Sequence, residues 1–129
     1  MNKILIEVST GELLDKISIL EIKKEKISDS ALLEIINFEY SILKNESDKK
    51  VKKDQKIDEL YKKLKKTNEK LWIIEDDKRL CEKNSDFGEK FIELSRNVHF
   101  LNDERAKIKL EINNYSKSKI KEVKKYTDY

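Results

Sequence analysis

The segment DFGEKFIELSRNVHFLNDERAKIKLEINNY, residues 86–115, decides the fold class. Apolar residues recur in it at alternating spacings of four and three, which is the pattern of an amphipathic helix that packs in a bundle. The pattern is formed by Phe87, Phe91, Leu94, Val98, Leu101, Ile108, Ile112 and Tyr115, with Arg105 in the remaining position. Asp86 and Glu89 have the spacing of a capping box. The segment is therefore predicted to be one long helix.

The preceding residues 57–83 have a similar apolar pattern, at positions 57, 60, 64, 71, 74 and 81. Thr67 and Lys78 fill its two polar positions. Only residues 84–86 separate the two predicted helices, so the chain is expected to fold back as an antiparallel hairpin. In that hairpin Thr67 would lie opposite Arg105.

Two further helices are predicted in the first half of the chain. Ser9 and Glu12 form a capping box for a helix that reaches about Ile27, and this helix is apolar on two faces. Asp29 or Ser30 caps the next helix, which ends before a polar loop at residues 45–56. Together the helices predict an all-α fold, an antiparallel bundle of about four helices. The alternating residues 3–8 also permit a short β ladder with residues 120–126.

Composition limits the classes of protein that the chain can belong to. Its 129 residues fit a single helical domain, 1–129, and the absence of proline with only two glycines disfavours β architectures. A net charge of +3 with interleaved signs argues against nucleic-acid binding. One cysteine and one histidine cannot build a structural Cys/His zinc site of four protein ligands, and no cofactor is indicated. No apolar run is long enough to cross a membrane, so a cytoplasmic protein is expected. The isoleucine and lysine bias is typical of an AT-rich genome.

Arg105 is the residue that most requires an explanation, because a guanidinium in a helix seam is costly without an anionic partner. Asn68 and Asn102 are expected to flank it, and Glu21 is the expected carboxylate partner, with Lys24 close by. One interpretation is a closed ion-pair network. The alternative is a site in which Arg105, Lys109 and Lys24 bind a carboxylate or phosphate, with Glu21 or Glu75 placed for proton transfer.

Other polar and apolar residues are candidates for a surface role. Glu75, Arg79 and Glu82 form a charged cluster near the hairpin tip, where i,i+4 pairs of a solvated helix are the simpler explanation. Interface candidates are Ile19 and Ile22, on the second apolar face of the first helix, and Arg96, which points away from the hairpin seam.

Four blocks of the sequence resemble an uncharacterised family of small helical bacterial proteins, also found in marine bacteria and their phages. The blocks are IEVSTGELLDKISILEIK (6–23), LWIIEDDKRLCE (71–82), FGEKFIELSRNVHFLNDERAKIKLEIN (87–113) and EVKKY (122–126). The resemblance implies a compact helical domain of unknown function, with a hint towards cell-surface glycan metabolism because some members are encoded near sugar-transfer genes. It implies no activity. The family's motif positions coincide with Glu12, Asp15, Lys16, Glu21, Lys23, Glu75, Asp76, Arg79, Glu82, Glu93, Arg96, Asn102, Asp103, Arg105 and Lys109.

Two functions follow as expectations. The first is a non-catalytic helical interaction or oligomerisation protein, forming a homo-oligomer, with a dimer favoured, or docking on a protein partner. The alternative is a small all-α protein, binding or enzymatic, with a polar site around Arg105 for an anionic metabolite related to sugar nucleotides.

Overall fold

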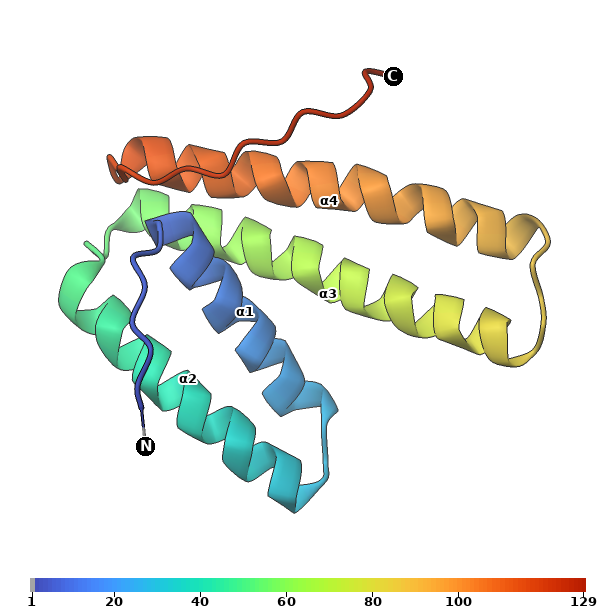
Figure 1. Cartoon of the computed structure of the whole chain (residues 1–129), viewed down its shortest axis with the longest axis horizontal. Helices are drawn as coiled ribbons and strands as arrows, with labels where there is room; N and C mark the ends of the chain where they lie inside the picture. Colours follow the sequence, from blue (N-terminus) through green and yellow to red (C-terminus); the bar gives the residue numbers. More distant parts are fainter. Residues whose placement is uncertain (1) are drawn as a thin grey trace.

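The computed structural model describes residues 2–129 and contains four helices, α1 (Thr10–Lys26), α2 (Ser30–Lys50), α3 (Gln55–Lys83) and α4 (Glu89–Tyr115) (Figure 1). Helices α3 and α4 form the predicted antiparallel hairpin, and contacts of Asp54 with Tyr115 and of Lys56 with Glu111 fasten its open end. Helices α1 and α2 form a second hairpin that crosses one half of the first (Figure 1). The prediction of an all-α bundle is confirmed.

Side-chain caps define the starts of the first three helices. Oxygens of Ser9, Asp29 and Asp54 accept hydrogen bonds from the backbone N–H three residues ahead, at 3.0 to 3.1 Å. The caps predicted at Ser9 and Asp29 are therefore confirmed. The predicted Asp86–Glu89 capping box is wrong, because α4 begins after Gly88 and Asp86 accepts from the Gly88 N–H at 3.2 Å instead. Asp86 is needed in the turn itself, where the preceding residue, Ser85, has a left-handed φ of 52°.

Two other expectations are wrong. Helix α2 continues to Lys50, so the loop expected at residues 45–56 is confined to the short link 51–54. Ion pairs of Lys44 with Asp48 and of Glu46 with Lys50 support the extra turns.

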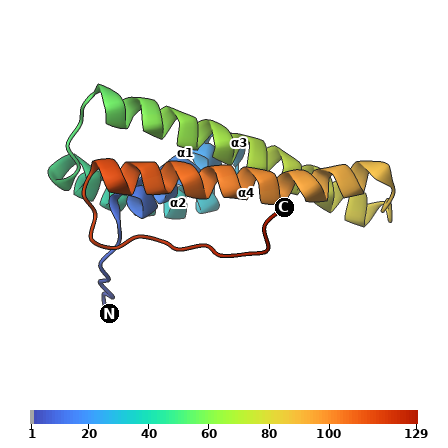
Figure 2. The same cartoon turned by 90° about the horizontal axis from the view of Figure 1, so that it is seen from above.

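No strand occurs among residues 2–129, so the β ladder between residues 3–8 and 120–126 is absent. A two-stranded ribbon is marginal without further packing, and the two segments diverge (Figure 2).

Helix α1 is the centre of the fold, because it packs against the other three helices, whereas α2, within the described residues, packs against α1 alone. The main core lies where α1 crosses the α3–α4 hairpin and contains Leu14, Ile17, Ile57, Leu60, Leu64, Ile108 and Ile112. Ile22 is 1% exposed, so its predicted role at an interface with another chain is wrong, since it is buried within its own chain. None of the described helices is long and apolar enough to span a membrane.

Candidate functional site: a buried ion-pair network

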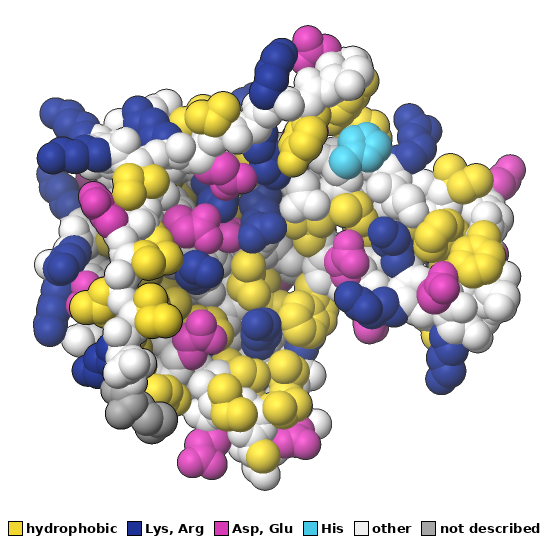
Figure 3. Space-filling model, viewed as in Figure 1, with side chains coloured by type: hydrophobic (Ala, Val, Ile, Leu, Met, Phe, Trp, Pro, Cys, Tyr) yellow, Lys and Arg dark blue, Asp and Glu magenta, His cyan; other side chains and the backbone are white. Residues whose placement is uncertain are grey.

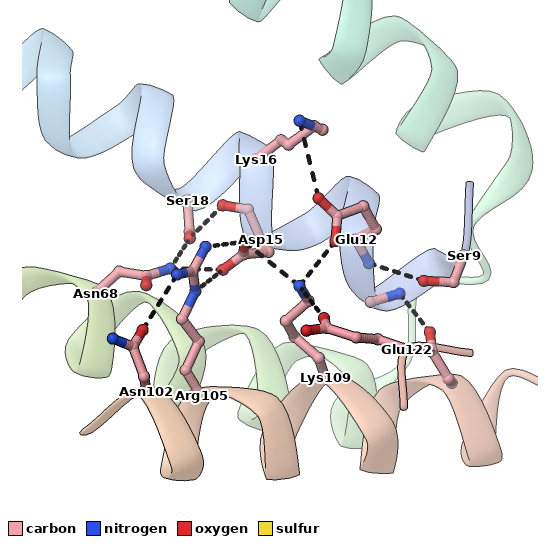
Figure 4. A network of polar contacts seen from close by, with 12 residues as sticks. Ser9, Glu12, Asp15, Lys16, Ser18, Asn68, Asn102, Arg105, Lys109 and Glu122 are labelled. Carbon is pink, nitrogen blue, oxygen red and sulfur yellow. Dashed lines mark hydrogen bonds and ion pairs between the residues drawn. The ribbon is translucent and has the colours of Figure 1, made fainter. Parts of the chain in front are cut away.

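Asp15 lies at the centre of a polar network between α1, α3 and α4 (Figure 4). Its side chain is buried, with 1% of the residue exposed, and it accepts a forked pair of hydrogen bonds from Arg105. The Nε–Oδ1 distance is 2.9 Å and the Nη2–Oδ2 distance is 2.5 Å. The amide of Asn68 donates to the same Oδ1 at 2.9 Å. Both carboxylate oxygens are thus satisfied by charge-assisted or amide hydrogen bonds.

Lys109 extends the network one turn along α4. Its ammonium donates to Glu12 at 2.7 Å and to Glu122 at 3.0 Å, and it lies 3.9 Å from Asp15. Glu122 belongs to the C-terminal segment that runs back along α4 (Figure 2). The buried lysine therefore fastens both α1 and the C-terminal segment to α4.

Neutral groups complete the site. Asn68 also donates to Ser18 Oγ at 2.8 Å, and that hydroxyl donates to the backbone carbonyl of Asp15 at 2.8 Å. Arg105 Nη1 makes a long contact of 3.4 Å with the amide oxygen of Asn102. The expectation that Asn68 and Asn102 would flank Arg105 therefore agrees with their positions, and Asn68 reaches it through Asp15.

The network stabilises the charged forms of its members. Burial opposes ionisation of Asp15, but hydrogen bonds from Arg105 and Asn68 and the charges of Arg105 and Lys109 outweigh it and lower the Asp15 pKa. Hydrogen bonding to Asp15 raises the pKa of Arg105. Burial also opposes the charge of Lys109, but hydrogen bonds to Glu12 and Glu122 raise its pKa. Hydrogen bonding to Lys109 lowers the pKa of Glu122.

Gly11 allows α1 to approach α4 closely enough for these contacts. Its backbone N–H donates to Asn113 Oδ1 at 2.7 Å. A Cβ atom at this position would lie 2.6 Å from the carbonyl oxygen of Lys109 and 2.8 Å from Asn113 Oδ1, both too close. Only glycine therefore fits, and the approach brings Glu12 and Asp15 to Lys109 and Arg105.

The prediction that Glu21 is the carboxylate partner of Arg105 is wrong. Glu21 pairs with Lys65 at 3.1 Å, because it lies six residues beyond Asp15, about 9 Å further along α1. Asp15 was identified only through the family resemblance, although a signal was present in the sequence. At about 100° per residue Asp15 lies on the same face as Ile22, and Gly11 and Ser18 share that face. All four residues are buried against the same chain.

The other predicted residues lie apart from the network. The ammonium group of Lys24 lies 4.0 Å from the centre of the Tyr40 ring, in a cation–π contact. It therefore does not join Arg105 and Lys109 in an anion site. Glu75, Arg79 and Glu82 form no ion pair among residues 2–129, and the last two are exposed, as in a solvated helix. Arg96 is exposed beside Phe100. Ile19 is half-buried.

A cleft of about 340 Å³ adjoins the network. It is lined by Glu12, Asn102, Arg105, Ala106, Lys109, Glu122 and Lys124. The three cations among these residues are balanced by Glu12, Glu122 and the buried Asp15 behind them. In the described part of the chain, no group of three His, Cys, Asp or Glu residues is placed to hold a metal ion.

The fold and the network define an all-α protein whose first helix is locked in place by buried ion pairs. The chain belongs to DUF6165, a family of unknown function, and the match covers residues 4–128. The expectation of a domain of unknown function is thereby confirmed. No curated protein and no solved structure matches the chain.

Proposed function

We propose that the protein is a non-catalytic helical interaction protein that assembles with a second copy of itself through the outer face of α2. We define this face by Leu32, Ile35, Phe38 and Ile42. These four large apolar residues are 49%, 66%, 70% and 49% exposed. This exposed face is the observation that carries the proposal.

Helix geometry separates this face from the one that packs inward. At about 100° per residue, the four side chains fall within an arc of about 120°. Leu33, Ile36, Tyr40 and Leu43 lie on the other side, towards α1. A helix that is apolar on two sides is typically buried on both. Among residues 2–129 α2 has helix–helix contacts with α1 alone, so no other described helix covers its outer face.

A second copy is the favoured occupant because a two-fold symmetric contact buries the same face of both chains. Full burial of one large aliphatic or aromatic side chain contributes about 1.5–3 kcal/mol, so two such faces supply a substantial driving force. Apolar side chains also gather on the projecting end of the α3–α4 hairpin (Figure 3). The cations of the Arg105 network are balanced by carboxylates of the same chain, which supports a structural role for the network.

Sedimentation velocity tests the proposal. We expect the wild type to be a dimer and Phe38→Asp to be a monomer with unchanged helical circular dichroism, because a charge in place of the most exposed apolar side chain of the face opposes its burial. Asn37→Asp is the matched control, since it adds the same charge to an exposed position on another side of α2. A monomeric wild type, or equal dissociation by both variants, would overturn the proposal.

The alternative, an anion-binding site, is supported by one observation. Arg105 lines the 340 Å³ cleft, and the hydrogen bond from its Nη1 to Asn102 is long, at 3.4 Å. The balanced charge of the cleft makes this the weaker candidate. A titration with inorganic phosphate, followed through the Arg105 side-chain NMR signal, tests it, and saturable shifts that Lys124→Ala weakens would favour it.

A further inference from the structure

We infer that Lys3–Val8, here called the N-terminal segment, pairs with the same segment of a second copy as a two-stranded antiparallel ribbon. The inference rests on the proposed dimer, because a ribbon of two strands is marginal unless other contacts hold the chains together.

The N-terminal segment is extended and almost entirely exposed. Ile4, Leu5 and Ile6 are 87%, 89% and 76% exposed, although all three are large apolar residues. No backbone group of residues 2–8 has a backbone hydrogen bond within the described chain. Figure 2 shows the segment projecting away from the helices. Such a segment presents both unpaired backbone groups and apolar side chains to a partner strand.

The sequence of the segment is complementary to itself in one antiparallel register. With Leu5 opposite Leu5 of the second copy, Ile4 lies opposite Ile6, and Lys3 lies opposite Glu7. Side chains alternate between the two faces of a strand. One face of the ribbon therefore carries only isoleucines at its centre, and the other carries a leucine pair between two Lys–Glu pairs. Cross-strand pairs of both kinds stabilise antiparallel strands.

The C-terminal segment is the other candidate to pair with the N-terminal segment, but it is already bound along α4 of its own chain. Glu122 is bound to Lys109, and Tyr129 donates a hydrogen bond to Asp103, so the segment is fastened along α4. Two residues beyond the N-terminal segment, the Thr10 N–H donates to Ser118 Oγ at 3.1 Å. The chain is therefore attached to the helices directly after the N-terminal segment, and residues 3–8 are free to pair with another strand.

Disulfide cross-linking tests the register. In a Cys81→Ala background, Leu5→Cys should give mainly disulfide-linked dimers on mild oxidation, because directly opposed residues have Cα atoms about 4.5–5.5 Å apart. Lys3→Cys is the matched control, since two such positions would lie about 13 Å apart in this register. Equal cross-linking of the two variants, or none in a dimeric protein, would overturn the inference.

Charge reversal gives an independent test. Lys3→Glu and Glu7→Lys each place like charges opposite one another twice per dimer, so each should weaken dimerisation about fivefold or more. The double variant restores opposite charges and should return to within about twofold of the wild type. Additive losses in the double variant would contradict the proposed pairing.

The outcomes separate this inference from the proposed function. If Phe38→Asp dissociates the dimer while Leu5→Cys does not cross-link, α2 is the contact and the ribbon is wrong. If Leu5→Cys cross-links only with Val123→Cys on another chain, the C-terminal segment is the partner and the self-pairing is overturned. A wild type that is monomeric at all concentrations overturns both.

Discussion

The carboxylate of Asp15 links α1 to both helices of the α3–α4 hairpin. Arg105 from α4 and Asn68 from α3 both donate to it, and Lys109 contributes a second positive charge nearby. The guanidinium of Arg105 depends on this carboxylate for its ion pair, whereas Lys109 is also paired with Glu12 and Glu122. A neutral side chain of the same shape would leave buried charge without a partner.

Asp15→Asn should therefore lower the free energy of unfolding by about 3–5 kcal/mol, the range typical of a broken buried ion pair. Urea unfolding followed by circular dichroism measures the change. Glu104→Gln is the control, because it removes a carboxylate from an exposed position on α4 and should leave stability nearly unchanged. A loss below about 1 kcal/mol for Asp15→Asn would mean that the network is solvated in solution.

The pH dependence gives the same prediction a second readout. The pKa of Asp15 is lowered in the folded protein, so its ionised form stabilises the fold fully above the unfolded-state pKa of about 3.9. That contribution is lost as the pH falls from this value through the folded-state pKa. The difference in unfolding free energy between wild type and Asp15→Asn should thus be constant above about pH 5 and shrink below about pH 4. A difference independent of pH would contradict this assignment.

The sequence predicted correctly that Arg105 needs a carboxylate partner, but the expected residue, Glu21, was wrong, because the partner is Asp15. The requirement comes from local chemistry, because a guanidinium in an apolar seam must be compensated. The choice between Glu21 and Asp15 depends on where α1 crosses the hairpin. Asp15 and Glu21 project about 120° apart on α1, and the projection of a single helix does not show which of its faces meets α4.

The close approach of α1 to α4 at Gly11 is the packing contact that brings the charged residues of the network together. Gly11→Ala should destabilise the protein by about 1–3 kcal/mol, because the new methyl group would meet the Lys109 carbonyl oxygen, which belongs to a helix backbone and cannot move aside. Alanine is the better helix former by about 1 kcal/mol, so the clash must exceed that gain. Thermal and urea unfolding measure the net effect.

Gly88→Ala is the matched control for this substitution. A Cβ at Gly88 would have one neighbour, Asp86 Oδ1 at 3.5 Å, and the φ of −80° suits any residue. Its stability should stay within about 0.5 kcal/mol of the wild type. Equal effects at the two glycines would show that the tight α1–α4 approach does not exist in solution.

Elements set by local signals were predictable, and elements set by packing were not. The caps at Ser9 and Asp29 and the apolar repeat of α4 depend on residues within a few turns of one another. The end of α2 depends instead on the burial of Ser47 and on ion pairs in a lysine-rich stretch that resembles a loop in composition. The two apolar faces of α1 are explained by its central position, because α1 packs against α2, α3 and α4 and Ile22 is buried within the chain.

Stability is unevenly distributed over the whole molecule. The core cluster lies at the crossing of α1 with the α3–α4 hairpin, whereas the other half of the hairpin projects beyond α1 (Figure 1). On that projecting half Ile73, Leu80, Phe87 and Ile92 are more than half exposed. Fewer buried contacts support its backbone hydrogen bonds, so local opening there should need less free energy than opening of the core.

Hydrogen exchange followed by mass spectrometry should reveal this gradient. In the monomeric Phe38→Asp variant, amides of residues 57–71 and 105–113 should exchange at least about tenfold more slowly than those of residues 77–83 and 89–96, because only the first set lies beside α1 and the core. The wild type at dimer-forming concentration is the comparison. If its projecting hairpin is slowed as well, the second copy covers the hairpin in addition to α2. Uniform protection along α3 and α4 in the monomer would contradict the gradient, since it would require the whole molecule to open as one cooperative unit.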